Sequence, residues 1–144
     1  MPLRFEQGNF EDARLVRTAV FIDEQGFNDE FDDIDQEPST IHVTLYEGDE
    51  LAGCVRTFPD PESPASSGRW VLGRLAVLPA MRKRGLGADL LEEAERLARD
   101  AGAAEMHLHA QCRVTPFYER AGYTLYGPVE LDEHVEHIWM KKTW

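Results

Sequence analysis

The chain has 144 residues, of which 42% are hydrophobic and 29% charged, and its formal net charge at pH 7 is −12. This composition is typical of one globular domain, and two cysteines without CxxC spacing exclude a disulfide framework. The negative charge lies in residues 1–67, with 16 acidic and 4 basic residues, because residues 68–144 hold 11 of each. Such a field repels nucleic acid and suits a cationic partner. No apolar run reaches the ~18 residues of a membrane span, and the start has no signal-peptide pattern, so we expect a cytoplasmic protein.

The first half predicts a strand, a helix and a hairpin. Residues 3–6 form a short strand, and Asn9 is placed to cap a helix whose apolar residues recur at helical spacing to about Phe21. Residues 22–40 are too acidic for a buried strand, so we expect a loop, or a loop with a short second helix. Alternating apolar residues on both sides of the turn EGDE predict a hairpin over residues 40–58.

The second half alternates strands with helices. We expect an exposed loop (59–69), a strand ended by Pro79 (70–79), an amphipathic helix that begins near Leu86 and is capped by Gly102, a strand (104–110), a short helix with Thr115 as cap and Pro116 as first residue, and two strands (123–127 and 134–142). This order predicts a single mixed α/β (α+β) domain over residues 1–144, with six or seven strands and three or four helices.

The stretch RKRGLGADLL, residues 82–91, combines three cations with two glycines at the start of a helix. The unpaired N–H groups and the dipole of a helix N-terminus bind anions, and Gly85 and Gly87 let a phosphate approach the backbone closely. The stretch therefore predicts a pyrophosphate site. It is not a P-loop, which ends in Gly-Lys-Ser/Thr, and it lacks the third glycine of the dinucleotide fingerprint.

Arg82-x-x-Gly85-x-Gly87 resembles the acetyl-CoA signature, Gln/Arg-x-x-Gly-x-Gly/Ala, of the GCN5-related N-acetyltransferases (GNAT). Downstream, HAQCRVTPFYERAGY is similar to the second signature of that family, and AVFIDEQGF and LDEHVEHIWMKK resemble its ElaA-like branch. The resemblance implies a GNAT-like fold, whose mostly antiparallel sheet is splayed between residues 70–78 and 104–110, with acetyl-CoA as acetyl donor.

The resemblance also implies which residues bind the donor, chiefly through their backbone groups. A strand edge would hold the pantetheine arm, the glycine turn would hold the pyrophosphate, and a glutamine would orient substrate or main chain at the splayed strand. The expected residues are Leu75, Ala76, Val77, Arg82, Lys83, Arg84, Gly85, Leu86, Gly87, Ala88, Gln111 and Phe117.

Acetyl transfer to an amine needs a proton donor for the departing thiolate and a group that accepts the amine proton. Tyr118 matches the tyrosine donor of the family, and its phenol is protonated at neutral pH. Glu24 and His137 are the predicted bases, with His109 and His134 as alternatives. The histidines lack the spacing of a zinc motif, so we expect no metal.

The predicted function is N-acetyltransfer from acetyl-CoA to a primary amine, on a small molecule or a peptide, by direct attack on the thioester. An acyl-CoA-binding module without catalytic activity is the alternative, and a nucleotide-binding regulatory domain is a weaker one. The acidic first half suits a cationic acceptor. We expect a monomer or homodimer that binds neither nucleic acid nor membranes.

Overall fold

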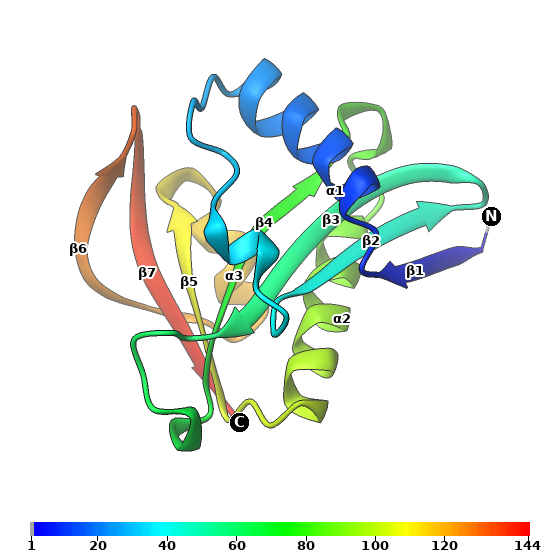
Figure 1. The fold of residues 1–144 in the computed structure, drawn as a ribbon. Coiled ribbons are helices and arrows are strands. Elements are labelled where there is room, and N and C mark those ends of the chain that lie inside the picture. Colours follow the sequence, from blue (N-terminus) through cyan, green and yellow to red (C-terminus); the bar gives the residue numbers. More distant parts are fainter. Residues whose placement is uncertain (1) are drawn as a thin grey trace.

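The computed structural model describes residues 2–144 (Figure 1). Its strands are β1 (Leu3–Gln7), β2 (Ile41–Glu47), β3 (Glu50–Pro59), β4 (Arg69–Val77), β5 (Glu105–Gln111), β6 (Thr124–Asp132) and β7 (Val135–Thr143). Its helices are α1 (Phe10–Arg17), α2 (Leu86–Asp100) and α3 (Thr115–Arg120). Short helical turns are η1 (Thr18–Glu24), η2 (Asp33–Gln36), η3 (Ala65–Ser67), η4 (Pro79–Met81) and η5 (Cys112–Val114). No helix within residues 2–144 is both long and apolar enough to cross a bilayer.

The seven strands form one sheet in the order β1-β2-β3-β4-β5-β7-β6. Only β4 and β5 are parallel, and every other neighbouring pair is antiparallel. A parallel pair needs a crossover, and α2 supplies it between β4 and β5. The predicted fold class, a mixed and mostly antiparallel sheet of six or seven strands with three or four helices, is confirmed.

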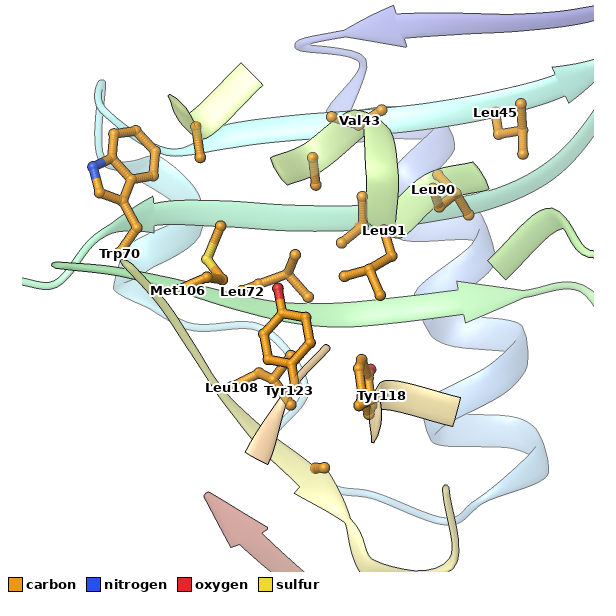
Figure 2. Packing of buried hydrophobic residues seen from close by; sticks show 14 of the residues in the cluster. Val43, Leu45, Trp70, Leu72, Leu90, Leu91, Met106, Leu108, Tyr118 and Tyr123 are labelled. Atoms are coloured by element: carbon orange, nitrogen blue, oxygen red, sulfur yellow. The ribbon is translucent and has the colours of Figure 1, made fainter. Parts of the chain in front are cut away.

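Helices α1 and α2 cover opposite faces of the sheet, as alternate residues of β3 show (Figure 1). Cys54 belongs to the buried cluster of α1, whereas Val55 belongs to the main core under α2. In that core, Leu90 and Leu91 of α2 lie against the strands near Leu72 (Figure 2). Full burial of each leucine contributes about 2 kcal/mol, so the amphipathic stripe of α2 fixes this helix on the sheet.

Three local predictions differ from the structure, and a fourth had left two alternatives open. The helix after Asn9 is α-helical only to Arg17 and then continues as a π-helix through η1, with the N–H of Gln25 bonding the carbonyl of Val20 at 3.1 Å. The acidic stretch contains the short helix η2, which was the second of the two alternatives. Val114 rather than Thr115 precedes the first residue of α3. Finally, β6 is longer than predicted.

The extra length of β6 comes from a bulge. The register moves from Tyr126↔Trp139 to Glu130↔His137, so the residues between Tyr126 and Glu130, which include Pro128, are accommodated without ending the strand. Proline in a strand is confined to edges and bulges, and β6 is the edge strand. The Gly127-Pro128 pair, at which the strand was predicted to end, therefore lies in a bulge within β6.

Candidate active site

The centre of the sheet opens into a cleft. β4 and β5 pair only between Arg69–Leu72 and Glu105–Leu108. Beyond these residues β4 continues with β3, and β5 continues with β7, so the two central strands separate. A cleft of about 420 Å³ lies in this fork. The predicted splay between these two strands is confirmed.

One wall of the cleft contains a β-bulge. The register between β3 and β4 shifts between Cys54 and Arg56, so Arg74 and Leu75 oppose the single residue Val55. Arg74 has a φ of 55°, in the left-handed region that non-glycine residues rarely adopt. A bulged residue is left out of the ladder, and Leu75 lines the cleft. The bulge therefore interrupts the β3–β4 ladder where β4 borders the cleft.

The glycine turn leads into α2 without a side-chain cap. Gly85 is the N-cap residue and has a φ of 74°. The first helical bond outside the turn runs from the N–H of Asp89 to the carbonyl of Gly85, so the N–H groups from Leu86 to Ala88 precede the ladder. A Cβ added at Gly85 would meet no atom within 4 Å, and this open space adjoins the free N–H groups. The turn therefore has the room and the donors that an anionic group requires.

Arg82 ties the turn to the π-helix. Its Nη1 and Nη2 donate to the two carboxylate oxygens of Glu24 at 2.8 and 2.6 Å, and its Nε donates to the carbonyl of Val77 at 2.9 Å. The hydrogen bond from Arg82 lowers the pKa of Glu24. Glu24 is not among the residues that line the cleft. This arrangement favours a structural role for Glu24 over that of the predicted base.

The other two cations of the turn differ from each other. Arg84 forms an exposed ion pair with Glu47 of β2. Lys83 makes no ion pair within residues 2–144, so its ammonium is free for a ligand. Of the three cations of the turn, Arg82 and Arg84 are thus paired with carboxylates of the protein itself.

Tyr118 lies on α3 between the diverging strands, with its ring in the main core (Figure 2). Only 9% of the residue is exposed, yet it lines the cleft, and its hydroxyl makes no hydrogen bond to any part of residues 2–144. Burial raises the pKa of its phenol, so the hydroxyl keeps its proton at neutral pH. The adjacent Phe117 lies 3.5 Å from where a Cβ of Gly87 would be, so α3 and the start of α2 are neighbours.

Two histidines face the cleft from the opposite wall. His137 on β7 is 6% exposed, and its Nδ1 contacts the carbonyl of Val135 at 2.9 Å. The ring of His109 on β5 lies 5.0 Å from that of His137 and stacks on Trp139 at 4.8 Å. Burial lowers the pKa of His109, while Glu130 approaches its Nε2 at 3.4 Å. A histidine that is neutral at pH 7 has a lone pair for a proton.

Gln111 bridges the mouth of the cleft. Its Nε2 donates to Oε1 of Gln25 at 2.8 Å, and its Oε1 accepts from Nε of Arg113 at 3.1 Å. Gln25 comes directly after the π-helix, so this bridge connects the end of β5 to the segment that covers the cleft. The predicted site residues Leu75, Gln111, Tyr118 and His137 therefore line one cavity.

An ionic network supports the wall formed by β3 and β4. It contains three arginines and three carboxylates: Arg17, Arg56, Arg74, Glu30, Asp32 and Asp35. Arg17 bonds Asp35 at 2.7 Å and Glu30 at 2.9 Å, Arg56 bonds Asp35 at 2.8 Å, and Arg74 contacts Glu30 at 3.0 Å. The network fastens α1 and the acidic segment to the bulge in β4. Arg17 was not predicted as part of a site, and its signal in the sequence is an arginine on the apolar face of α1, beside Ala13 and Val16.

Within residues 2–144, no three side chains of histidine, cysteine, aspartate or glutamate gather in a way that could hold a metal ion.

Comparison with known proteins identifies the family. The profile of the acetyltransferase (GNAT) family matches residues 9–123. The chain therefore belongs to the GNAT acetyltransferase family, a family of acyltransferases, as the two signatures predicted. It is 32% identical over 142 residues to the uncharacterized N-acetyltransferase YjcF of Bacillus subtilis, covering 92% of this chain and 91% of YjcF.

Solved structures share the same fold. Escherichia coli ElaA superposes with a TM-score of 0.86 at 20% identity, over 98% of this chain and 99% of ElaA. An acyl-CoA N-acyltransferase from Pseudomonas aeruginosa also gives a TM-score of 0.86, at 24% identity, over 99% of this chain and 100% of that protein. The predicted likeness to ElaA thus holds for the fold.

Proposed function

We propose that this protein transfers an acetyl group from acetyl-CoA to a primary amine by direct attack of the amine on the thioester. The observation that carries the proposal is the position of Tyr118, which lines the cleft in the fork between β4 and β5 and whose hydroxyl makes no hydrogen bond within residues 2–144. The same fork is bordered by the bulge at Leu75 and lies beside the uncapped start of α2. The Pseudomonas aeruginosa neighbour, described as an acyl-CoA N-acyltransferase, supports a CoA thioester as donor.

The donor would occupy two groups of residues, the bulged end of β4 and the turn before α2. Backbone groups from Leu75 to Val77 would bind the pantetheine arm, and the N–H groups at the start of α2 would bind the pyrophosphate. Lys83 adds a free positive charge to that end. The acetyl group would then lie in the fork, where the acceptor amine must reach it.

The reaction forms a C–N bond and breaks the C–S bond of the thioester. The neutral amine nitrogen attacks the carbonyl carbon, the thiolate leaves with the bonding electron pair, and one proton passes from nitrogen to a base. Tyr118 gives its phenolic proton to the thiolate. His137 is our proposed base, because its Nδ1 is occupied by the carbonyl of Val135 while the ring lines the cleft. The products are an N-acetyl amine and free CoA.

A thiol-release assay with a panel of primary amines tests the proposal. Tyr118→Phe keeps the ring and removes only the proton, so turnover should fall by about 10²- to 10⁴-fold while CoA affinity is unchanged. Tyr123→Phe is the matched control, since Tyr123 does not line the cleft, and its turnover should remain close to that of the parent. CoA binding without thiol release for any amine would instead support a binding module without catalytic activity.

We also keep as proposals a single domain over residues 1–144, a cytoplasmic location, and a monomer or homodimer. We also propose that the acceptor binds as a cationic ammonium and is deprotonated before it attacks. The single seven-stranded sheet supports the assignment of one domain.

A further inference from the structure

One wall of the cleft is built from aromatic rings. On the side of β5 and β7 the rings follow one another without a break: Trp139 and His109 at 4.8 Å, His109 and His137 at 5.0 Å, and His137 and Phe27 at 6.3 Å. The register of the two strands causes this order, because His109 pairs with Trp139 on one face of the sheet. All four rings line the cleft, and we call them the aromatic wall.

The charges at the mouth of the cleft are mainly negative. Asp29, Asp132 and Glu133 line it, whereas Arg56 and Arg74 belong to the ionic network, in which three carboxylates balance three arginines. Arg113 is the remaining arginine of the lining within residues 2–144, and it donates to Gln111.

One of these carboxylates, that of Glu133, is held in place. Glu133 accepts hydrogen bonds from the N–H groups of Asn28 and Asp29, at 2.8 and 2.9 Å, which joins the turn between β6 and β7 to the segment after the π-helix. An ammonium group would therefore meet negative charge on both the turn between β6 and β7 and the segment after the π-helix, which contact each other. Asp29 and Asp132 make no ion pair within residues 2–144, so their charge is available to a ligand.

We infer that the acceptor is a primary amine carried on an aromatic or similarly flat apolar body, a statement that rests on the proposed acetyltransfer. The carboxylates at the mouth attract the ammonium form, and the aromatic wall accommodates the body by stacking. A linear polyamine would satisfy the carboxylates but would leave the aromatic wall without a complementary surface. The wall and the charge together thus favour an arylalkylamine.

The test compares acceptors of equal charge and different shape. The kcat/KM for 2-phenylethylamine should exceed that for butylamine by about tenfold or more, with spermidine and a lysine peptide as the competing classes. 2-Cyclohexylethylamine has the same reach without aromaticity, so it separates stacking from apolar burial. A preference for spermidine or for the lysine peptide overturns the inference.

Variants of the wall give the second readout. Trp139→Leu should raise the KM for 2-phenylethylamine by about tenfold and change butylamine less than about twofold. Trp144→Leu is the control, because Trp144 lies beside Arg99 and outside the cleft. If Trp139→Leu does not fold, as judged by thermal unfolding, Phe27→Leu tests the same wall from another element. Equal losses for all amines overturn the inference.

Calorimetry keeps the inference separate from the proposed function. Calorimetry measures the affinity of 2-phenylethylamine for the complex of the protein with CoA. If Trp139→Leu weakens this affinity, the inference is supported even if no acetyl transfer occurs. Transfer to amines without any preference for shape supports the proposed function and overturns the inference. Absence of both amine binding and transfer overturns both.

Discussion

Asp35→Asn should be strongly destabilising, because the Asp35 carboxylate is the centre of the ionic network. Its side chain is 1% exposed and accepts hydrogen bonds from Arg17 at 2.7 and 3.0 Å and from Arg56 at 2.8 Å. The variant keeps the shape of the side chain but leaves one positive charge without its counterion. Removal of one partner from a buried ion pair costs about 3–5 kcal/mol of unfolding free energy.

The pKa of Asp35 gives a separate figure for part of this cost. Burial alone would raise that pKa, but the hydrogen bond and charge of Arg17, followed by the N–H of Asp32 and the charge of Arg56, lower it from 3.8 to about 2. A lowering of this size corresponds to about 2 kcal/mol of stability. Since the folded-state pKa is the lower one, this contribution is present above pH 4 and is lost as the pH falls from about 4 to about 2. Asp35→Asn lacks it at every pH.

Urea unfolding at pH 7, 5 and 3, followed by circular dichroism, measures the effect. The difference between parent and variant should be largest at pH 7 and 5 and smaller at pH 3. Asp32→Asn is the control, because Asp32 also binds Arg56 but is 40% exposed, and it should cost about 1 kcal/mol or less. The reasoning fails if Asp35→Asn costs less than about 1 kcal/mol at pH 7, or if the difference grows as the pH is lowered.

Three further predictions concern the candidate site. Gly85→Val introduces a side chain at a φ of 74° and into the space beside the free N–H groups, so CoA affinity measured by calorimetry should fall at least about tenfold. Gly8→Val has similar backbone strain far from the turn and should leave CoA affinity unchanged; equal effects of the two variants would contradict the placement. His137→Gln should lower kcat by about 10²-fold or more, and an unaltered kcat would remove it as the base. Glu24→Gln breaks the pair with Arg82 and should change kcat by less than about threefold, whereas a loss of about 10²-fold would show that Glu24 is catalytic.

The sequence by itself determined the elements whose signals are local. The apolar stripe of α2, the glycine turn at Gly85 and the hairpin of β2 and β3 all matched the structure, because helical period, strand alternation and turn residues act over a few neighbouring positions. The two signatures also placed Tyr118 correctly on a short helix. Local rules gave a wrong end for β6, because a bulge and a strand end share the same Gly-Pro signal.

Only the tertiary structure decided which side chains meet. Glu24 pairs with Arg82, 58 residues away, and the aromatic wall depends on the register that brings His109 beside Trp139. The acidic segment contains a buried charge, which its composition did not predict. The carboxylate of Asp35 is buried because the distant Arg17 neutralises it inside the fold. Burial makes that pairing obligatory, because an unpaired charge inside the protein costs too much free energy. No pattern of neighbouring residues records which distant partner supplies the compensating charge.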